Sequence, residues 1–202
     1  MTISFPIDEK LILASSSPRR AEILTAVGWP FSSVAAGIDE TRRPEEQPVE
    51  YVQRLAKEKA EAVASSLESG LVLGADTTVV VEETLLGQPH DQHDARRMLT
   101  LLSGKWHEVL TGVAVVRVSG ESKVDYERTR VRFAEMSEKD IDWYTSTGEP
   151  KGKAGAYAVQ GAAALFIEEI QGDYFNVVGL PIRRVFEMVK AMFALRQPQP
   201  KS

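Results

Sequence analysis

The chain contains no cysteine among its 202 residues. Disulfide bonds, thiolate metal sites and cysteine nucleophiles are therefore excluded. No hydrophobic run approaches the roughly 18 residues of a membrane-spanning helix, so we expect no membrane association. Residues 1–10 include Asp8 and Glu9 and no long apolar segment, which does not fit a secretory signal peptide. Together these absences predict a cytoplasmic protein.

Positive charge is not in excess. Lys and Arg total 24 against 29 Asp and Glu, which gives a net charge of −5 at pH 7. Proteins that bind duplex nucleic acid need a broad basic face, so that class of partner is not expected. A small anionic ligand needs only a local basic pocket. The GxSxG, Walker A and HExxH motifs are absent as well.

The length and the patterning indicate one α/β domain. With 43% hydrophobic residues the chain can form one sizeable core, and we expect a single domain over residues 1–196. The polar, proline-rich residues 197–202 predict a disordered tail. Strand patterns alternate with helical patterns, which predicts a mixed sheet flanked by helices. The predicted strands are residues 11–14, 31–36, 71–81, 108–118, 124–133 and 165–170, and the predicted helices are residues 18–27, 48–67, 91–102, 137–145 and 180–194.

A serine- and arginine-rich segment follows the first predicted strand. Ser15 and Ser17 precede Pro18, which suits the first position of a helix. We expect the Ser17 hydroxyl to cap that helix. Arg19 and Arg20 fall in its first turn, where a cation is unfavourable unless an anion binds there. The segment therefore predicts a phosphate site; the alternative is a capped helix whose arginines pair with surface carboxylates.

Two strand ends carry candidate metal-ligating carboxylates. Asp76 ends the buried-type strand pattern of residues 71–76, and the pair Asp39 and Glu40 follows the second predicted strand, where it can supply a second carboxylate. A carboxylate at a strand end often faces the ligand crevice of an α/β protein. With a divalent cation, such a group can orient and deprotonate water. The alternative for each is an ordinary solvated turn.

Residues 147–161 form a glycine- and lysine-rich segment. Its glycines permit close backbone approach to a ligand, and Lys153 is the better phosphate candidate because its neighbours are small. Gln160 offers both a donor and an acceptor, which suits a uracil or thymine edge. The alternative is a flexible loop with solvated lysines.

Other charged positions carry weaker signals. Lys57 and Lys59 lie two residues apart on a predicted helix, so at most one faces the crevice. His90 and His93 are expected to be exposed rather than to bind a metal.

An ordered series of short motifs resembles the Maf family of nucleotide pyrophosphatases over residues 11–187. The motifs are residues 14–20, 39–40, 55–60, 74–77, 101–104 with His107, 148–150, 152–155, 157–161 and 178–181. The resemblance implies hydrolysis of a nucleoside triphosphate to the monophosphate and pyrophosphate, with a divalent metal (Mg²⁺ or Mn²⁺). It further implies two lobes around a deep cleft, as in inosine triphosphatases, and a homodimer.

The resemblance also implies roles for single residues. Asp76 matches the catalytic proton acceptor, and Arg19, Thr77 and Gln160 match specificity positions. Other cleft positions are matched by Glu40, Lys59 and Lys153. The sequence of residues 153–161 resembles that of the branch that acts on dTTP and UTP, whereas the branch that acts on 7-methyl-GTP has Glu at the position of Gln160.

The chain departs from the family pattern at Gln88, where a lysine usually precedes the proline. One positive charge near the expected triphosphate is therefore lost. Two alternatives stay open beside a pyrimidine pyrophosphatase. One is a nucleotide-binding regulator of cell division without catalysis, and the other is the same chemistry on a methylated or purine nucleotide.

Overall fold

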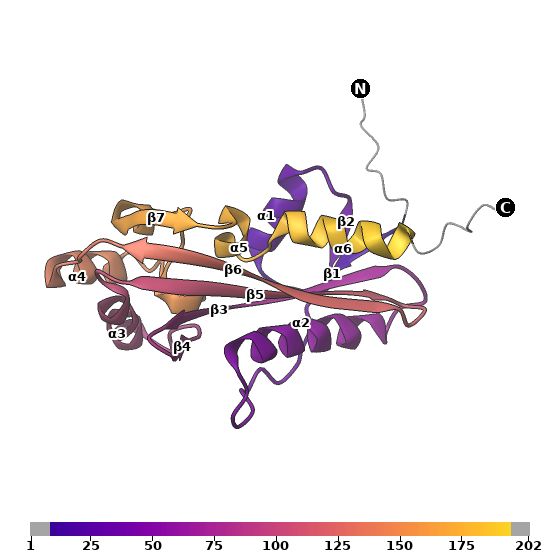
Figure 1. The fold of residues 1–202 in the computed structure, drawn as a ribbon, viewed down its shortest axis with the longest axis horizontal. Helices are drawn as coiled ribbons and strands as arrows, with labels where there is room; N and C mark the ends of the chain where they lie inside the picture. Colours follow the sequence, from indigo (N-terminus) through magenta and orange to yellow (C-terminus); the bar gives the residue numbers. More distant parts are fainter. Residues whose placement is uncertain (1–8, 195–202) are drawn as a thin grey trace.

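The computed structural model describes residues 9–194, which form one mixed sheet flanked by helices (Figure 1). Most of the predicted domain lies within them, whereas its first residues, its limit at residue 196 and the predicted tail lie outside the described residues. Of the described helices, none combines the length and apolar composition needed to cross a bilayer. The strands are β1 (Leu11–Leu13), β2 (Phe31–Ser33), β3 (Leu71–Val81), β4 (Thr84–Leu86), β5 (Trp106–Arg117), β6 (Ser122–Phe133) and β7 (Ile167–Gln171). The helices are α1 (Pro18–Ala26), α2 (Pro48–Ala64), α3 (Gln92–Leu102), α4 (Glu138–Ser146), α5 (Tyr174–Val178) and α6 (Ile182–Ala194), with 3-10 turns η1 (Ala154–Ala156) and η2 (Ala162–Phe166).

The sheet contains seven strands in the order β2-β1-β3-β5-β6-β7, with β4 also paired to β3. β1 runs parallel to β2 and β3, and the other pairs are antiparallel. The prediction of a mixed sheet is therefore confirmed. β3, β5 and β6 are long enough to extend through the whole molecule (Figure 1).

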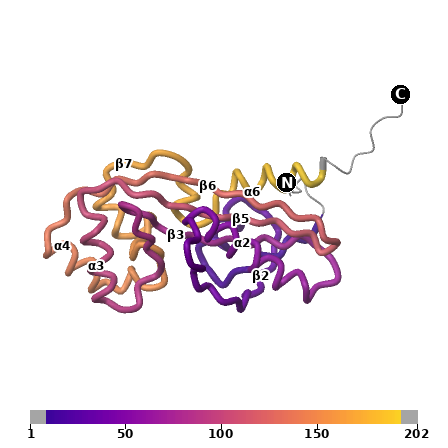
Figure 2. The backbone as a smooth tube through the Cα atoms, turned by 60° about the horizontal axis from the view of Figure 1, so that its bottom comes forward, coloured from indigo at the N-terminus to yellow at the C-terminus, as the bar shows by residue number. Residues whose placement is uncertain are grey.

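Helices cover both faces of the sheet and separate into two groups along the long strands. α2 packs on one face, and α1, α5 and α6 lie on the other (Figure 1). α3 and α4 pack together around the far ends of the long strands. Figure 2 shows the two groups side by side, joined by the long strands. This is the two-lobed arrangement that the family resemblance implied.

The departures from the predicted elements are local. The second strand ends at Ser33, and the strand expected from residue 165 begins at Ile167, after η2. β4 was not predicted, because the turn before it uses Glu82 and Glu83 with positive φ, where glycine is the usual signal. α5 was also not predicted, because five residues are too few to show a helical period.

Two glycines let α2 approach the sheet closely. A Cβ at Gly74 in β3 would lie 2.0 Å from the carbonyl oxygen of Ala56, and one at Gly112 in β5 would lie 2.1 Å from that of Val52. The φ of both glycines is ordinary, so they are required for space rather than for conformation. The close approach sets how far a side chain on α2 reaches across β3.

We expect Gly74→Ala to lower the free energy of unfolding by about 1–3 kcal/mol, because its methyl group forces α2 away from β3. Urea denaturation measures this change. Gly37→Ala is the matched control, since a Cβ there meets no heavy atom within 4 Å. Equal stability of the two variants would contradict the close packing.

Candidate active site

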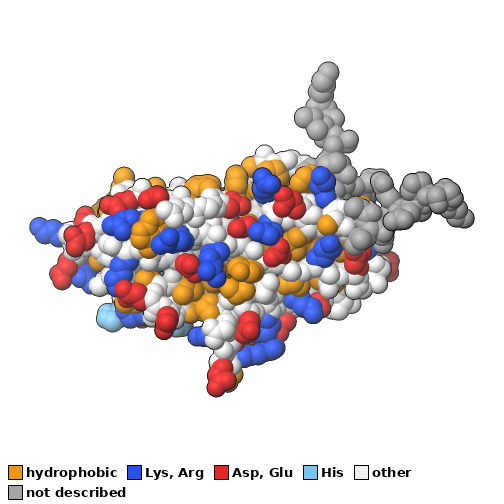
Figure 3. All heavy atoms as spheres, viewed as in Figure 1, with side chains coloured by type: hydrophobic (Ala, Val, Ile, Leu, Met, Phe, Trp, Pro, Cys, Tyr) orange, Lys and Arg blue, Asp and Glu red, His pale blue; other side chains and the backbone are white. Residues whose placement is uncertain are grey.

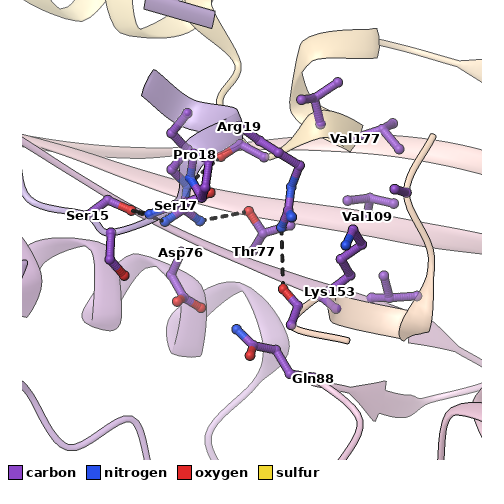
Figure 4. A pocket seen from close by; sticks show the side chains of 18 of the residues that line it. Ser15, Ser17, Pro18, Arg19, Asp76, Thr77, Gln88, Val109, Lys153 and Val177 are labelled. Carbon is purple, nitrogen blue, oxygen red and sulfur yellow. Dashed lines mark hydrogen bonds between the residues drawn. The ribbon is translucent and has the colours of Figure 1, made fainter. Parts of the chain in front are cut away.

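A cavity of about 330 Å³ lies between the two lobes, bordered by the segment before α1, by α2 and β3, and by residues 152–160 (Figure 4). Every residue that the sequence nominated lies on its wall. These residues are Ser15, Ser17, Arg19, Arg20, Glu40, Lys59, Asp76, Thr77, Lys153 and Gln160. The structure thus brings five separate segments together at one place, while the role of each residue stays a prediction.

The carboxylates of Asp76 and Glu40 converge on one ammonium group. Lys59 Nζ lies 2.7 Å from Asp76 Oδ1 and 2.9 Å from Glu40 Oε1. Lys59 and Asp76 are 8% and 7% exposed, so this pair is largely shielded from water. Burial raises the pKa of Asp76, and the charges of Lys59 and Arg20 only partly oppose this effect. Lys57 is exposed and pairs with Glu61, so of the two lysines on α2 that the sequence offered only Lys59 faces the cavity, as predicted.

Arg20 is held by three acceptors from three segments. It donates to the carbonyl oxygen of Gly179 (2.8 Å), to Ser15 Oγ (3.1 Å) and to Thr77 Oγ1 (3.2 Å). Among the described residues neither Arg19 nor Arg20 forms an ion pair with a carboxylate. The arrangement therefore opposes the alternative in which the arginines serve surface salt bridges.

The expected capping role of Ser17 is wrong. Ser17 does precede α1, with Pro18 in the first turn, but its side chain makes no capping hydrogen bond. Instead the Ser17 N–H donates to Ser15 Oγ (3.1 Å), which turns the segment toward the cavity. Arg19 extends across the cavity to the carbonyl oxygen of Gly152 (3.5 Å), as Figure 4 shows. The arginine thereby links α1 to the opposite lobe.

A chain of buried polar groups behind Thr77 was missed by the sequence analysis. Thr77 Oγ1 lies 3.0 Å from Thr111 Oγ1, and Thr111 donates to the main-chain oxygen of Asn176 (3.2 Å). Asn176 itself donates to the Val109 carbonyl oxygen (3.0 Å). Since the Thr111 proton is used on Asn176, Thr77 is the donor of the pair. The sequence signal for this network was Thr111, a single polar residue within the otherwise apolar run 109–116.

Lys153 and Gln160 approach the cavity from the second lobe. Burial, followed by the charge of Arg19, lowers the pKa of Lys153. Gln160 is exposed and makes no hydrogen bond to any described residue. Gln88 also lines the cavity and projects into it from the side opposite Arg19 (Figure 4).

The family model described as Maf-like protein matches residues 10–192. The chain belongs to the Maf family. Proteins called dTTP/UTP pyrophosphatase are 52% identical over 90% of this chain and 93% of the relative in Symbiobacterium thermophilum, and 48% identical over 94% and 93% in Syntrophus aciditrophicus. The Ham1 protein of Staphylococcus aureus shares the fold, with a TM-score of 0.51 at 11% identity over 94% of this chain and 100% of that one.

Glu40 and Asp76 are the predicted metal ligands of this Maf chain, and the structure places their carboxylates together. Within residues 9–194, no group of three or more His, Asp or Glu side chains gathers as a metal site would. His90 and His93 are exposed, as expected. Glu40 and Asp76 supply hard oxygen donors that converge on one cation, Lys59. Mg²⁺ typically uses one or two carboxylates and leaves other positions to phosphate and water.

His107 supports Tyr157, an aromatic residue in the wall of the Maf cavity. It is 2% exposed, and its Nε2 lies 2.9 Å from the hydroxyl of Tyr157, which lines the cavity. His107 also packs edge-on against Phe133. Burial lowers the pKa of His107 to about 4, so the ring is neutral at pH 7.

We expect His107 to make stability depend on pH. The unfolded chain takes up a proton near pH 6.5 and the folded chain only near pH 4, so stability is complete above pH 6.5 and falls between these values. Over this range the free energy of unfolding should fall by about 3 kcal/mol in total. Urea unfolding of wild type and of His107→Gln between pH 7 and pH 4 measures it. A difference between the two proteins that does not change with pH would contradict a buried neutral histidine.

Proposed function

We propose that the chain hydrolyses dTTP and UTP to the nucleoside monophosphate and pyrophosphate. The observation that carries the proposal is the buried Asp76, held by Lys59 in a cavity that also contains Arg19, Arg20 and Gln160. The naming of the Maf relatives as dTTP/UTP pyrophosphatases supports the choice of substrate. The homodimer and the cytoplasmic location stay predictions.

The cationic side of the cavity suits a triphosphate. The α1 N-terminus faces the cavity through residues 15–19, and a helix N-terminus favours anions. Three of the five N–H bonds of Arg20 go to protein acceptors, so two remain for phosphate oxygens. Arg19, Lys59 and Lys153 add positive charge around the same space. A net acidic chain can therefore still bind a strongly anionic ligand.

Glu40 and Asp76 fit a divalent cation such as Mg²⁺ or Mn²⁺. Their oxygens already lie within 2.9 Å of one positively charged atom, and both are hard donors. When bound, the cation neutralises phosphate oxygens and lowers the pKa of coordinated water.

Asp76 is the proposed proton acceptor. It takes a proton from water as the water oxygen attacks the α-phosphorus, and the bond from that phosphorus to the bridging oxygen breaks. Pyrophosphate leaves with the bonding electron pair. Its developing charge is stabilised by the preorganised cations Arg19, Lys59 and Lys153.

The base site is proposed to lie at the far side of the cavity. Val109, Val177 and Tyr157 give this part an apolar wall, which suits the face of a pyrimidine. Gln160 and Thr77 are the proposed readers of the base edge. An amide presents a donor beside an acceptor, which matches the alternating carbonyl and N–H groups of uracil and thymine.

Asp76→Asn tests the catalytic assignment. We expect turnover to fall by about 10²–10⁴-fold, because the amide cannot accept the proton, while the protein stays folded. The assay follows pyrophosphate and orthophosphate separately for a panel of nucleoside triphosphates with Mg²⁺. Asp125→Asn, a surface partner of Arg184, is the control and should keep full activity.

The panel also separates the alternatives. Pyrophosphate from dTTP and UTP with little from purine nucleotides supports the proposal. Nucleotide binding without turnover in the wild type would favour a regulator, and preference for a purine or methylated nucleotide would overturn the substrate. Unchanged turnover in Asp76→Asn would remove Asp76 from its role.

Gln88→Lys should improve activity on dTTP, because it adds a positive charge beside the proposed triphosphate site. Since Gln88 is exposed, we expect the added charge to stabilise the transition state by about 0.5–1 kcal/mol, which corresponds to roughly a two- to fivefold rise in kcat/KM. The gain should shrink in high salt. Gln171→Lys, on the exposed edge strand β7, is the control. Equal kcat/KM for both variants would contradict a triphosphate next to position 88.

A further inference from the structure

The segment that carries Lys153 and Gln160 is closed at its base by one side chain. Glu149 begins this segment just after α4, and η2 follows its end. The Glu149 carboxylate accepts hydrogen bonds from the N–H groups of Ala162 (2.9 Å) and Ala163 (3.4 Å). The two ends of residues 149–163 are thereby joined.

Glu149 performs the capping task that the residue before η2 cannot perform. Gly161 occupies the N-cap position and has no side chain to accept the first N–H groups of the turn. The carboxylate from twelve positions earlier takes that place. A Cβ at Gly161 would lie 2.3 Å from Glu149 Oε2, although the φ of Gly161 is an ordinary −111°. A larger residue at position 161 would thus displace the carboxylate from this place.

Tyr144 holds Glu149 from inside the second lobe. The Tyr144 ring is fully buried, and its hydroxyl donates to Glu149 Oε1 (2.7 Å). The same hydroxyl accepts from the N–H of Ala158 (3.3 Å). Although burial alone would raise the pKa of Glu149, the hydrogen bonds from Tyr144, Ala162 and Ala163 outweigh it and lower this pKa. Glu149 and Tyr144 together are called the clamp below, and its carboxylate is charged at neutral pH.

Gln160 lies within the turn that this clamp encloses. The Gly161 N–H donates to the carbonyl oxygen of Ala158 (3.0 Å), which forms a tight turn with Gln160 near its tip. Ala158 is fixed by Tyr144 on one side of the turn, and Ala162 by Glu149 on the other. Because the Gln160 side chain bonds to no described residue, its position depends on the backbone of this turn.

We propose that Glu149, held by Tyr144, is a positioning residue for nucleotide selectivity: it fixes the turn at residues 158–161 so that Gln160 meets the base. The inference rests on the proposed function, in which Gln160 reads a pyrimidine. A site must hold a recognition group within about half an ångström to discriminate ligands. Loss of the clamp should therefore change which nucleotide is preferred and not only the rate.

The decisive readout is the ratio of kcat/KM for dTTP to kcat/KM for dCTP, measured on one preparation. A partly unfolded variant loses both activities in proportion, so the ratio does not change with the folded fraction. We expect Glu149→Gln and Tyr144→Phe to lower the ratio about five- to tenfold, the order expected for a misplaced hydrogen-bonding group. Tyr144→Phe keeps the charge of Glu149, so it excludes a purely electrostatic effect through Lys153.

Two matched variants serve as controls. Glu138→Gln changes an exposed carboxylate at the start of α4, and Tyr174→Phe removes the hydroxyl of an exposed tyrosine. Both should keep the wild-type ratio. An unchanged ratio in Glu149→Gln and Tyr144→Phe, with dTTP preferred by the wild type, would overturn the inference.

Amide hydrogen exchange tests the clamp without turnover. We expect the N–H groups of Ala158 and Ala162 to exchange faster in Tyr144→Phe than in wild type, and not in Tyr174→Phe. Unchanged exchange would overturn the clamp itself. A wild type that lacks a preference for dTTP, with faster exchange in Tyr144→Phe, would instead overturn the proposed substrate and leave the clamp supported.

Discussion

The site depends on the close contact between α2 and the strands β3 and β5. Gly74 and Gly112 remove the side chains that would otherwise keep the helix at an ordinary distance. Lys59, on α2, can then reach across to Asp76 on β3 within 2.7 Å. If α2 packed at an ordinary distance from the sheet, Lys59 would not reach Asp76. The buried carboxylate would then lose this partner, which is costly for a charged group.

Charge is distributed locally and not over the whole molecule. The surface shows Lys and Arg interspersed with Asp and Glu over the face drawn in Figure 3, consistent with a chain of net charge −5. Inside the cavity, however, four cationic side chains face two carboxylates. Arg20 joins three segments there, and its network extends through the Thr77 hydroxyl to the buried hydroxyl of Thr111. The same contacts that fix the fold therefore also prepare a site for an anion.

The sequence predicted the parts that depend on local pattern. Long apolar strands and the order of short motifs were sufficient for the mixed sheet and for the residues of the cavity wall. The predicted Ser17 cap is wrong, and it is the neighbouring Ser15 hydroxyl that accepts hydrogen bonds, from the Ser17 N–H and from Arg20. Asn176 and Glu149 could not be assigned from the sequence. Their partners include main-chain groups brought near by folding, and no spacing in the sequence reports such contacts.

The central claim is attack by water at the α-phosphorus of a pyrimidine triphosphate in this cavity. Hydrolysis of dTTP in ¹⁸O-labelled water, followed by mass analysis of both products, tests it most directly. We predict that the label enters dTMP and that pyrophosphate carries none. Label in pyrophosphate would place the attack on the β-phosphorus and contradict the account of Asp76 and its surroundings.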